Sequence, residues 1–225
     1  MAARLPLRLS LLLKPRGRRR FIQLLPVGAS VLDVGCGNGS PQLTLRQRPD
    51  LHYTGVDVCD APPFALPPGA VLQTLEPGQF ATGIASLRGR FDAVISAHNL
   101  EHCDDPDATL SAMIASLKPG GRLFLAFPCE ASIGFPRRAG TLNFHDDPTH
   151  RACPSLKQVM AQLEPHCRIE FVSARYRPWL LAMAGLLLEP WSALTRRNAP
   201  AGTTWALYGF ESVIWAQRRP KAGAP

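Results

Sequence analysis

The sequence predicts an α/β fold: a doubly wound, mostly parallel sheet of seven strands with helices on both faces. Seven strand-like runs alternate with helical patterns, and such alternation is typical of parallel sheets that are covered on both sides. The chain has 225 residues, of which 46% are hydrophobic and 19% charged, so it can bury a large core. This composition excludes a disordered chain, a collagen and a coiled coil. No apolar run approaches the roughly 20 residues that span a bilayer.

The first half of the chain supplies four of the expected strands. They are short, largely apolar runs at Ser30–Val34, His52–Asp57, Ala70–Thr74 and Phe91–Ser96. Ser40 and Pro41 are typical of a helix N-cap and of the first helical position. We therefore expect a helix from Ser40 to about Gln47.

The second half supplies two helices, three strands and two insertions. Apolar residues recur at helical spacing after Asp105-Pro106, up to the break at Pro119, and again before Pro165: Leu110, Met113, Ile114 and Leu117, then Leu156, Val159, Met160 and Leu163. The remaining strands are expected at Arg122–Phe127, Arg168–Val172 and Phe210–Ala216. Residues 129–153 and 176–203 do not fit the alternation, and long insertions of this kind are often functional loops.

Basic residues are concentrated at the N-terminus. Residues 1–20 contain seven of the 25 lysines and arginines and no acidic residue, while the whole chain has a net charge of +8. The rest of the chain is therefore nearly neutral. A nucleic-acid enzyme more often carries its basic residues across a binding face, so the pattern indicates a basic arm at 1–20 and makes a nucleic-acid partner unlikely.

Two further features bear on where the protein acts. The six cysteines form no Cys-x-x-Cys pair and no secretory signal is visible, which predicts reduced thiols in a cytoplasmic protein. The apolar run at 179–191 has a tryptophan at each end and arginines around it. Together with the basic arm, this run suits a peripheral membrane contact. A buried helix, which is the commoner use of such a run, and a dimer face remain open as alternatives.

The strongest chemical signal follows the first strand. Three glycines at alternate positions, Gly35, Gly37 and Gly39, lie between Asp33 and the expected helix. Glycines there let the backbone turn sharply and approach a ligand closely. Asp57 ends the next strand, where nucleotide-binding folds place an acid for the ribose hydroxyls. The spacing differs from the dinucleotide fingerprint, and the carboxylate ahead of the glycines suits a cationic ligand.

Four motifs in order resemble those of a known family: Asp33–Gly39, Gly55–Asp57, Phe91–Ser96 and Leu117–Gly121. They look like class I S-adenosylmethionine-dependent methyltransferases of the small-molecule branch described as type 11 or 12. The resemblance covers about residues 20–128. It implies a Rossmann-like sheet with an antiparallel last strand, a single methyltransferase domain over residues 21–225, and S-adenosyl-L-methionine as the cofactor.

The resemblance also assigns cofactor-binding roles. Asp33 and the glycine loop would hold the aminocarboxypropyl part of the cofactor, Asp57 the ribose and Val58 the adenine. The stretch that leaves the fourth strand would lie beside the transferable methyl group. The implied set is Asp33, Gly35, Cys36, Gly37, Asn38, Gly39, Asp57, Val58, His98 and Asn99.

Histidines supply the candidates for catalysis. A histidine with a near-neutral pKa could remove a proton from the acceptor. Leu100-Glu101-His102 resembles a frequent motif of the family, and the insertion adds two more histidines. The candidates are His98, His102, His145 and His150, although His102 could instead only pack the fold. These side chains could also make a metal site, but loop histidines and carboxylates are more often solvated, so no metal is predicted.

The acceptor is less well defined than the cofactor. The leading interpretation is a methyltransferase that acts on a small-molecule, glycan or lipid-linked acceptor. A quinone-type methyltransferase at the membrane is an alternative, because the sequence offers both polar and apolar groups for the acceptor side. A non-catalytic, cofactor-binding partner subunit is a second alternative, although the histidines are numerous for an inactive pocket.

Overall fold

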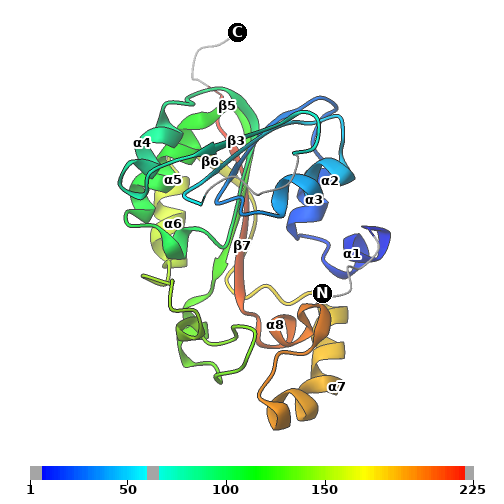
Figure 1. Cartoon of the computed structure of the whole chain (residues 1–225). Coiled ribbons are helices and arrows are strands. Elements are labelled where there is room, and N and C mark those ends of the chain that lie inside the picture. Colours follow the sequence, from blue (N-terminus) through cyan, green and yellow to red (C-terminus); the bar gives the residue numbers. More distant parts are fainter. Residues whose placement is uncertain (1–6, 60–65, 221–225) are drawn as a thin grey trace.

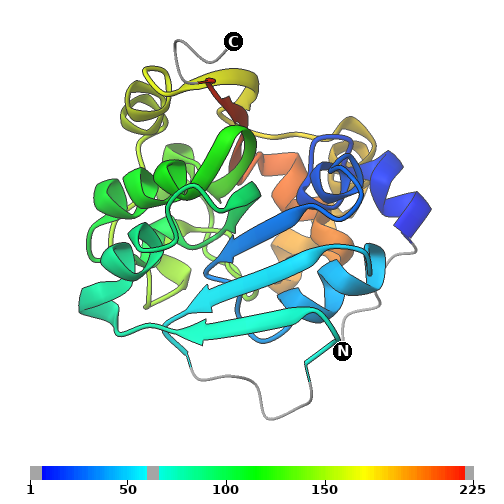
Figure 2. The ribbon, with the colours of Figure 1, turned by 90° about the horizontal axis from the view of Figure 1, so that it is seen from above.

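The computed structural model describes residues 7–59 and 66–220, and its centre is a seven-stranded sheet in the order β3-β2-β1-β4-β5-β7-β6 (Figure 1). The pairs β3–β2, β2–β1, β1–β4 and β4–β5 are parallel, whereas β7 runs antiparallel to both β5 and β6. Figure 2 shows β1, β2 and β3 side by side and pointing the same way. The predicted fold class, including the antiparallel last strand, is confirmed.

The first half of the chain builds one end of the sheet and its helices. The elements are α1 (Leu7–Leu13), α2 (Arg18–Gln23), β1 (Ser30–Val34), α3 (Ser40–Gln47), β2 (His52–Asp57), β3 (Ala70–Thr74), the 3-10 turn η1 (Pro77–Gln79), α4 (Phe80–Ala85) and β4 (Phe91–Ala97). The bounds of β1, α3, β2 and β3 agree with those expected from the sequence, and β4 is one residue longer.

The second half adds the remaining strands and both insertions. The elements are η2 (Leu100–His102), α5 (Pro106–Ser116), β5 (Leu117–Pro128), η3 (Glu130–Gly134), η4 (Phe144–Asp146), α6 (Leu156–Leu163), β6 (Cys167–Ser173), α7 (Trp179–Thr195), η5 (Pro200–Gly202), α8 (Thr203–Tyr208) and β7 (Glu211–Arg218). β5 begins earlier than the expected Arg122, because Phe91 pairs with Leu117 and Ala93 with Arg122 across a register shift. Gly120, at φ +78°, lies within that irregularity.

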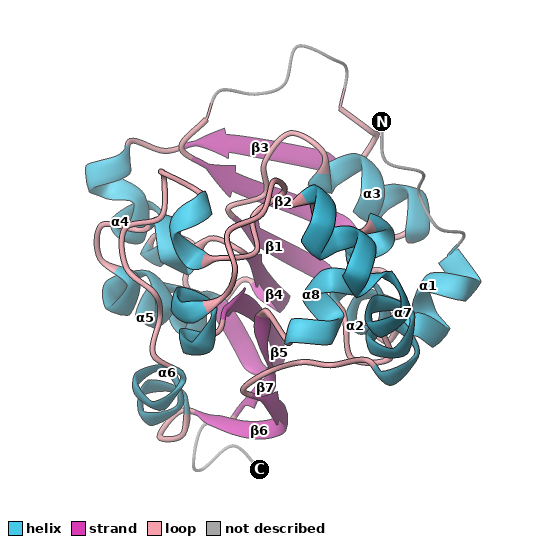
Figure 3. Cartoon of the chain, turned by 90° about the horizontal axis from the view of Figure 1, so that it is seen from below, coloured by secondary structure: helices cyan, strands magenta, loops and turns pink. Residues whose placement is uncertain are grey.

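Helices cover both faces of the sheet and define two cores. Figure 3 shows α4, α5 and α6 on one side and α2 and α3 on the other. The first face buries a mainly aliphatic cluster that includes Met113; the second contains an aromatic group in which Phe21 packs edge-on against Trp215. Trp215 of β7 and Phe21 of α2 are almost fully buried, so these two elements supply two of the most buried aromatic side chains of the second core.

Part of the basic N-terminal segment is built into this second core. The indole nitrogen of Trp215 donates a hydrogen bond to the Arg16 carbonyl at 3.0 Å, and the Arg16 amide donates to the Tyr176 hydroxyl at 2.9 Å. The Arg16 guanidinium also lies over the Trp215 ring. Arg4 lies outside the described residues, as does the side chain of Arg8. The boundary predicted at residue 20 therefore falls within α2, after residues that already pack on the sheet.

The apolar segment 179–191 forms most of α7, and most of it is exposed. Only Leu181, Gly185 and Ser192 of α7 are buried, whereas Trp179 is 70% and Leu187 80% exposed. A Cβ on Gly185 would lie 2.3 Å from the Thr203 carbonyl oxygen, so this glycine allows α7 to pack closely against the start of α8. A helix buried under the sheet, the commoner use of such a run, is not what this segment forms.

An ion pair joins the two insertions, and we expect Arg138→Ala to lower the free energy of unfolding. The buried Arg138 guanidinium donates to Glu189 of α7 at 2.8 and 2.5 Å and to the Ser192 hydroxyl at 2.7 Å. Removal of the cation leaves Glu189 without its main partner, at a cost of about 2–3 kcal/mol because that carboxylate is only partly buried. Chemical denaturation measures this, with the exposed Arg137→Ala as control. Equal losses in the two variants would contradict the pairing argument.

Candidate active site

The glycine loop between β1 and α3 leaves open space beside it. Gly35 and Gly37 have φ of +70° and +54°, a backbone region that residues with a Cβ adopt only at a cost. A Cβ on Gly35 would lie 2.3 Å from the Asn99 side chain, so this glycine is needed for packing inside the protein. A Cβ on Gly37 or Gly39 would meet no atom of the described residues within 4 Å. These two positions face space that a ligand can occupy.

Asp57 fixes the shape of the loop from the end of β2. Its carboxylate accepts hydrogen bonds from the Gly37 amide at 2.7 Å and from the Cys59 amide at 3.1 Å. A cavity of about 190 Å³ lies beside it, lined by Val58, by Asn99 and His102 after β4, and by residues of η1 and α4. The half-exposed Val58, for which the resemblance implies contact with the adenine, thus lines this cavity.

Asp33 is the centre of a buried polar cluster under the loop. Its carboxylate is only 2% exposed and accepts hydrogen bonds at 2.6 Å from each of Arg18, Ser40 and Tyr53. Burial raises the pKa of the Tyr53 hydroxyl well above its usual range, and the Asp33 charge adds to this. Burial likewise raises the pKa of Cys36 to about 12, so this loop thiol is not a nucleophile at neutral pH. No sequence signal distinguishes Arg18 from the other six basic residues among residues 1–20.

His98 lies at the end of β4 between two glutamates. Its Nδ1 is 3.1 Å from Glu101 and its Nε2 is 2.9 Å from Glu211 of β7. Burial lowers the pKa of His98, but the hydrogen bonds to both carboxylates outweigh it and raise that pKa to about 10. The imidazole is therefore held as a cation at neutral pH, which is not the free base that the sequence suggested.

A second cavity, of about 280 Å³, opens on the other side of His98. Its wall is largely apolar and includes Leu13 of α1, Leu181 of α7, Phe124 and Ala126 of β5 and Val213 of β7. Its polar lining consists of Lys14, Arg18, Arg19, His98 and Glu211. Desolvation raises the pKa of Glu211, but the charge of Lys14 and the hydrogen bond from His98 outweigh it and lower the pKa to about 2. The cavity thus combines an apolar wall with a charged end.

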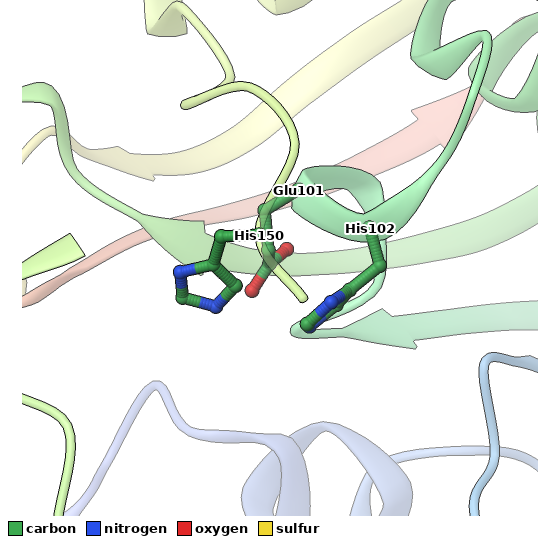
Figure 4. Close-up of side chains that lie close together, drawn as sticks. All are labelled: Glu101, His102 and His150. Atoms are coloured by element: carbon green, nitrogen blue, oxygen red, sulfur yellow. The ribbon is translucent and has the colours of Figure 1, made fainter. Parts of the chain in front are cut away.

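The other candidate histidines separate into a pair and an outlier. His102 and His150 lie on either side of the Glu101 carboxylate, with ring centroids 4.8 Å apart (Figure 4). His145 is exposed and its ring meets only the edge of Phe144 among the ring contacts of the described residues. The structure therefore brings His98, His102 and His150 around Glu101 and leaves His145 outside the group.

Comparisons with known proteins agree with this geometry. A family model described as a methyltransferase domain matches residues 3–189. A ubiquinone biosynthesis O-methyltransferase of Xanthomonas axonopodis pv. citri is 40% identical over 204 residues, which cover 84% of this chain and 79% of that protein. A protein of the same name from Pseudomonas aeruginosa is 31% identical over 112 residues, or 44% of each chain.

Solved structures support the fold alone, because their sequence identities are low. A methyltransferase from Archaeoglobus fulgidus has a TM-score of 0.56 at 18% identity over 94% of both chains. The 1,6-didemethyltoxoflavin-N1-methyltransferase of Burkholderia thailandensis, solved with S-adenosylhomocysteine, has a TM-score of 0.52 at 16% identity, covering 87% of this chain and 72% of that one. The fold, the glycine loop and the match over most of the chain lead to one conclusion: the protein belongs to the class I methyltransferases and is an enzyme that uses S-adenosylmethionine.

Proposed function

We propose that the enzyme transfers the methyl group to a hydroxyl of a small aromatic acceptor that carries an apolar tail, as a quinone precursor does. One observation carries this proposal: consecutive residues at the end of β4 line both cavities. Ala97 and His98 border the larger cavity, while Asn99 borders the one beside Asp57. Acceptor and cofactor can therefore meet at this stretch. The names of the relatives, which describe O-methyltransferases of ubiquinone biosynthesis, favour the same class of acceptor.

The smaller cavity and the glycine loop fit the adenosine and amino-acid parts of S-adenosylmethionine. The space above Gly37 and Gly39, which no atom of the described residues fills, suits a ligand pressed against the backbone. The carboxylate of Asp57 can accept hydrogen bonds from ribose hydroxyls, while the buried Asp33 would support the glycine loop from below through Arg18, Ser40 and Tyr53. These residues are the proposed cofactor site.

The chain's own residues would act mainly by orientation. S-adenosylmethionine supplies an electrophilic methyl group, and displacement at that carbon requires the acceptor oxygen in line with the breaking sulfur–carbon bond, with the hydroxyl proton released to water. The apolar wall of the larger cavity would hold the ring and tail of the acceptor, while His98 and Glu211 would hold its hydroxyl at the charged end. A glycan would leave this apolar wall without a partner, so the cavity favours the lipid-like acceptor.

Isotopic labelling tests the acceptor class directly. Purified enzyme is incubated with methyl-labelled S-adenosylmethionine and separate aqueous and lipid extracts of cells. We expect the label to enter the lipid fraction, in a product that releases the label under ether-cleaving conditions. A Leu181→Arg variant, which places a charge in the apolar wall, should lose this incorporation while still binding the cofactor. Incorporation into the aqueous fraction alone would replace this proposal with a polar acceptor such as a glycan.

Replacement of Asp57 tests the cofactor site. We expect Asp57→Ala to weaken S-adenosylmethionine binding by about 1.5–3 kcal/mol, because charge-assisted hydrogen bonds to the ligand are lost. Asp57→Asn is the matched variant, since its side-chain oxygen can still accept from the Gly37 amide and keep the loop in place. Calorimetry should show a smaller loss for Asn than for Ala. Unchanged affinity in both variants would refute the assigned role.

The exposed face of α7 supports a peripheral membrane contact. Leu181 on its buried side lines the acceptor cavity, while Leu187 and Leu194 on the outside are more than three-quarters exposed. In the described parts of the chain no helix is long and apolar enough to cross a membrane. An apolar surface flanked by arginines is suited to reversible binding at an anionic interface. We propose that α7 brings the enzyme to the membrane that holds its acceptor.

Vesicle sedimentation tests this contact. The protein should sediment with anionic vesicles at low salt and be partly released at high salt, because the electrostatic part is screened. Leu187→Glu should reduce the bound fraction at both salt concentrations. Val27→Glu is the control, since Val27 is 89% exposed and lies between α2 and β1, outside α7. If the two variants bind alike, α7 is not the contact surface.

A further inference from the structure

Three potential metal ligands gather where the second half of the insertion at 129–153 meets η2. Glu101 and His102 belong to η2, and His150 comes from the loop after η4. One ligand atom from each residue lies within 4.8 Å of the others, and Figure 4 shows both imidazoles turned toward the carboxylate. The loop is held there by the Arg151 amide, which donates to the Glu101 carbonyl at 2.8 Å.

Glu101 carries an oxygen that lacks a partner. The side chain is fully buried, and its Oε1 accepts a hydrogen bond from Nδ1 of His98. Its Oε2 is buried and has no hydrogen-bond partner among the described residues. A buried carboxylate oxygen without a partner costs free energy, so native proteins normally supply one. A cation between Glu101 and the two histidines would supply it.

The hydrogen bonds of His150 fix its tautomer. Its Nδ1 lies 2.6 Å from the Phe144 carbonyl, which can only accept, so Nδ1 is the protonated nitrogen. In the neutral ring the lone pair is then on Nε2. The ring stacks on Phe144 at 4.6 Å and its side chain is only 5% exposed, so its orientation is set before any ligand arrives.

His102 is fixed in the same way by Thr149. Its Nδ1 lies 3.2 Å from the Thr149 carbonyl and 3.0 Å from the Thr149 hydroxyl. That hydroxyl donates its own hydrogen to Asp147 at 2.6 Å, so toward His102 it can only accept. Nδ1 of His102 is therefore protonated and Nε2 carries the lone pair. Metal-binding histidines have this arrangement, in which the second ring nitrogen donates to an oxygen.

We propose that Glu101, His102 and His150 bind one divalent transition-metal cation, through Oε2 of the glutamate and Nε2 of each histidine. Two imidazoles and one carboxylate suit Zn²⁺ and its first-row neighbours, whereas Mg²⁺ and Ca²⁺ prefer all-oxygen sets. Ligands about 2.1 Å from a tetrahedral ion lie about 3.4 Å apart, so ligand atoms that are now up to 4.8 Å apart must close by up to about 1.4 Å. The half-buried His102 can make this movement.

The proposed ion would lie beside the cofactor cavity. His102 lines that cavity together with Asp57 and Asn99, so the ion would be close to the carboxyl end of β4. Three protein ligands leave coordination positions for water or for an oxygen of a bound molecule. The ion would also tie the insertion to η2, in addition to the hydrogen bonds and the contact of the two imidazole rings that join them. The sequence allowed a metal site at these histidines but none was predicted, because loop histidines are more often solvated and 48 positions separate His150 from His102.

Metal titration tests the site without any methyl transfer. Protein stripped with a chelator and dialysed is titrated with Zn²⁺ by calorimetry and with Co²⁺ by visible absorption, in the absence of cofactor and acceptor. We expect one equivalent to bind, with Co²⁺ bands that indicate nitrogen and oxygen ligands in a site of low symmetry. His150→Ala should weaken Zn²⁺ binding by at least about 100-fold, more than the loss of an outer hydrogen bond would.

The matched control is His145→Ala, which removes an exposed histidine from the same insertion and should leave the affinity unchanged. Glu101→Gln is the second variant and should also weaken binding, with thermal melting without metal used to verify that each variant folds. The Co²⁺ spectrum of the wild-type protein tests the site even if a variant fails to fold. Absence of saturable binding, or equal affinity in His150→Ala and wild type, would overturn the metal site and leave the proposed methyl transfer untouched.

Discussion

Gly37→Leu is expected to abolish S-adenosylmethionine binding while the protein still folds. The Gly37 Cβ position faces open space, so a leucine side chain would project into the volume proposed for the cofactor rather than into the core. Affinity should fall by at least about 100-fold, which corresponds to ~2.7 kcal/mol. The positive φ adds about 1–2 kcal/mol of backbone strain, which lowers the melting temperature only modestly. Calorimetry and thermal melting separate the two effects.

Gly35→Ala is the informative comparison for this experiment. Its Cβ would lie within 2.6 Å of three atoms of the Asn99 side chain, so the protein itself must rearrange. We therefore expect a clear loss of melting temperature in Gly35→Ala and a loss of affinity without comparable destabilisation in Gly37→Leu. If Gly37→Leu binds the cofactor as tightly as wild type, the space beside the loop is not part of the cofactor site.

The predicted sheet was accurate because its signals are local. Each strand of the first half is a short run that ends in turn residues, and Ser40-Pro41 marks the start of α3. The N-cap is Gly39, however, and not Ser40, which is the first helical residue and donates its hydroxyl to Asp33. The early start of β5 was missed because Lys118–Gly121 looks like a simple helix stop. Only the pairing of Phe91 with Leu117 reveals that the strand has already begun. That pairing depends on tertiary structure.

Only the parts of the site whose residues are close together in the sequence could be predicted. The glycine loop and Asp57 are recognisable from spacing, whereas Arg18 of α2 reaches Asp33 of β1 and Glu211 reaches His98 across 113 positions. The apolar composition of α7 also did not show whether the helix is buried in the protein or exposed on its surface. The helix packs through Leu181, Gly185 and Ser192 and leaves the rest of its apolar surface in solvent.

His98→Asn is expected to lower turnover by about 100-fold while cofactor affinity is retained, because the acceptor would no longer be held in position. His98 has a φ of +55°, and asparagine tolerates this left-handed conformation better than alanine, so the substitution removes the imidazole with little backbone strain. It leaves Glu211 without the hydrogen bond that orients it in the acceptor cavity. The acceptor hydroxyl would then lose its position relative to the methyl group.

Steady-state kinetics with a labelled cofactor measure this effect, and Glu211→Gln provides the matched test. The glutamine keeps the size of Glu211 and can still accept a hydrogen bond from His98, but it removes the negative charge that pairs with the imidazolium. If the charged pair positions the acceptor, both variants lose turnover, and the double variant loses little more than the worse single one because the two residues act as a unit. Additive losses, or a loss confined to melting temperature, would show instead that His98 only packs the end of β4 against Trp205 and Phe210.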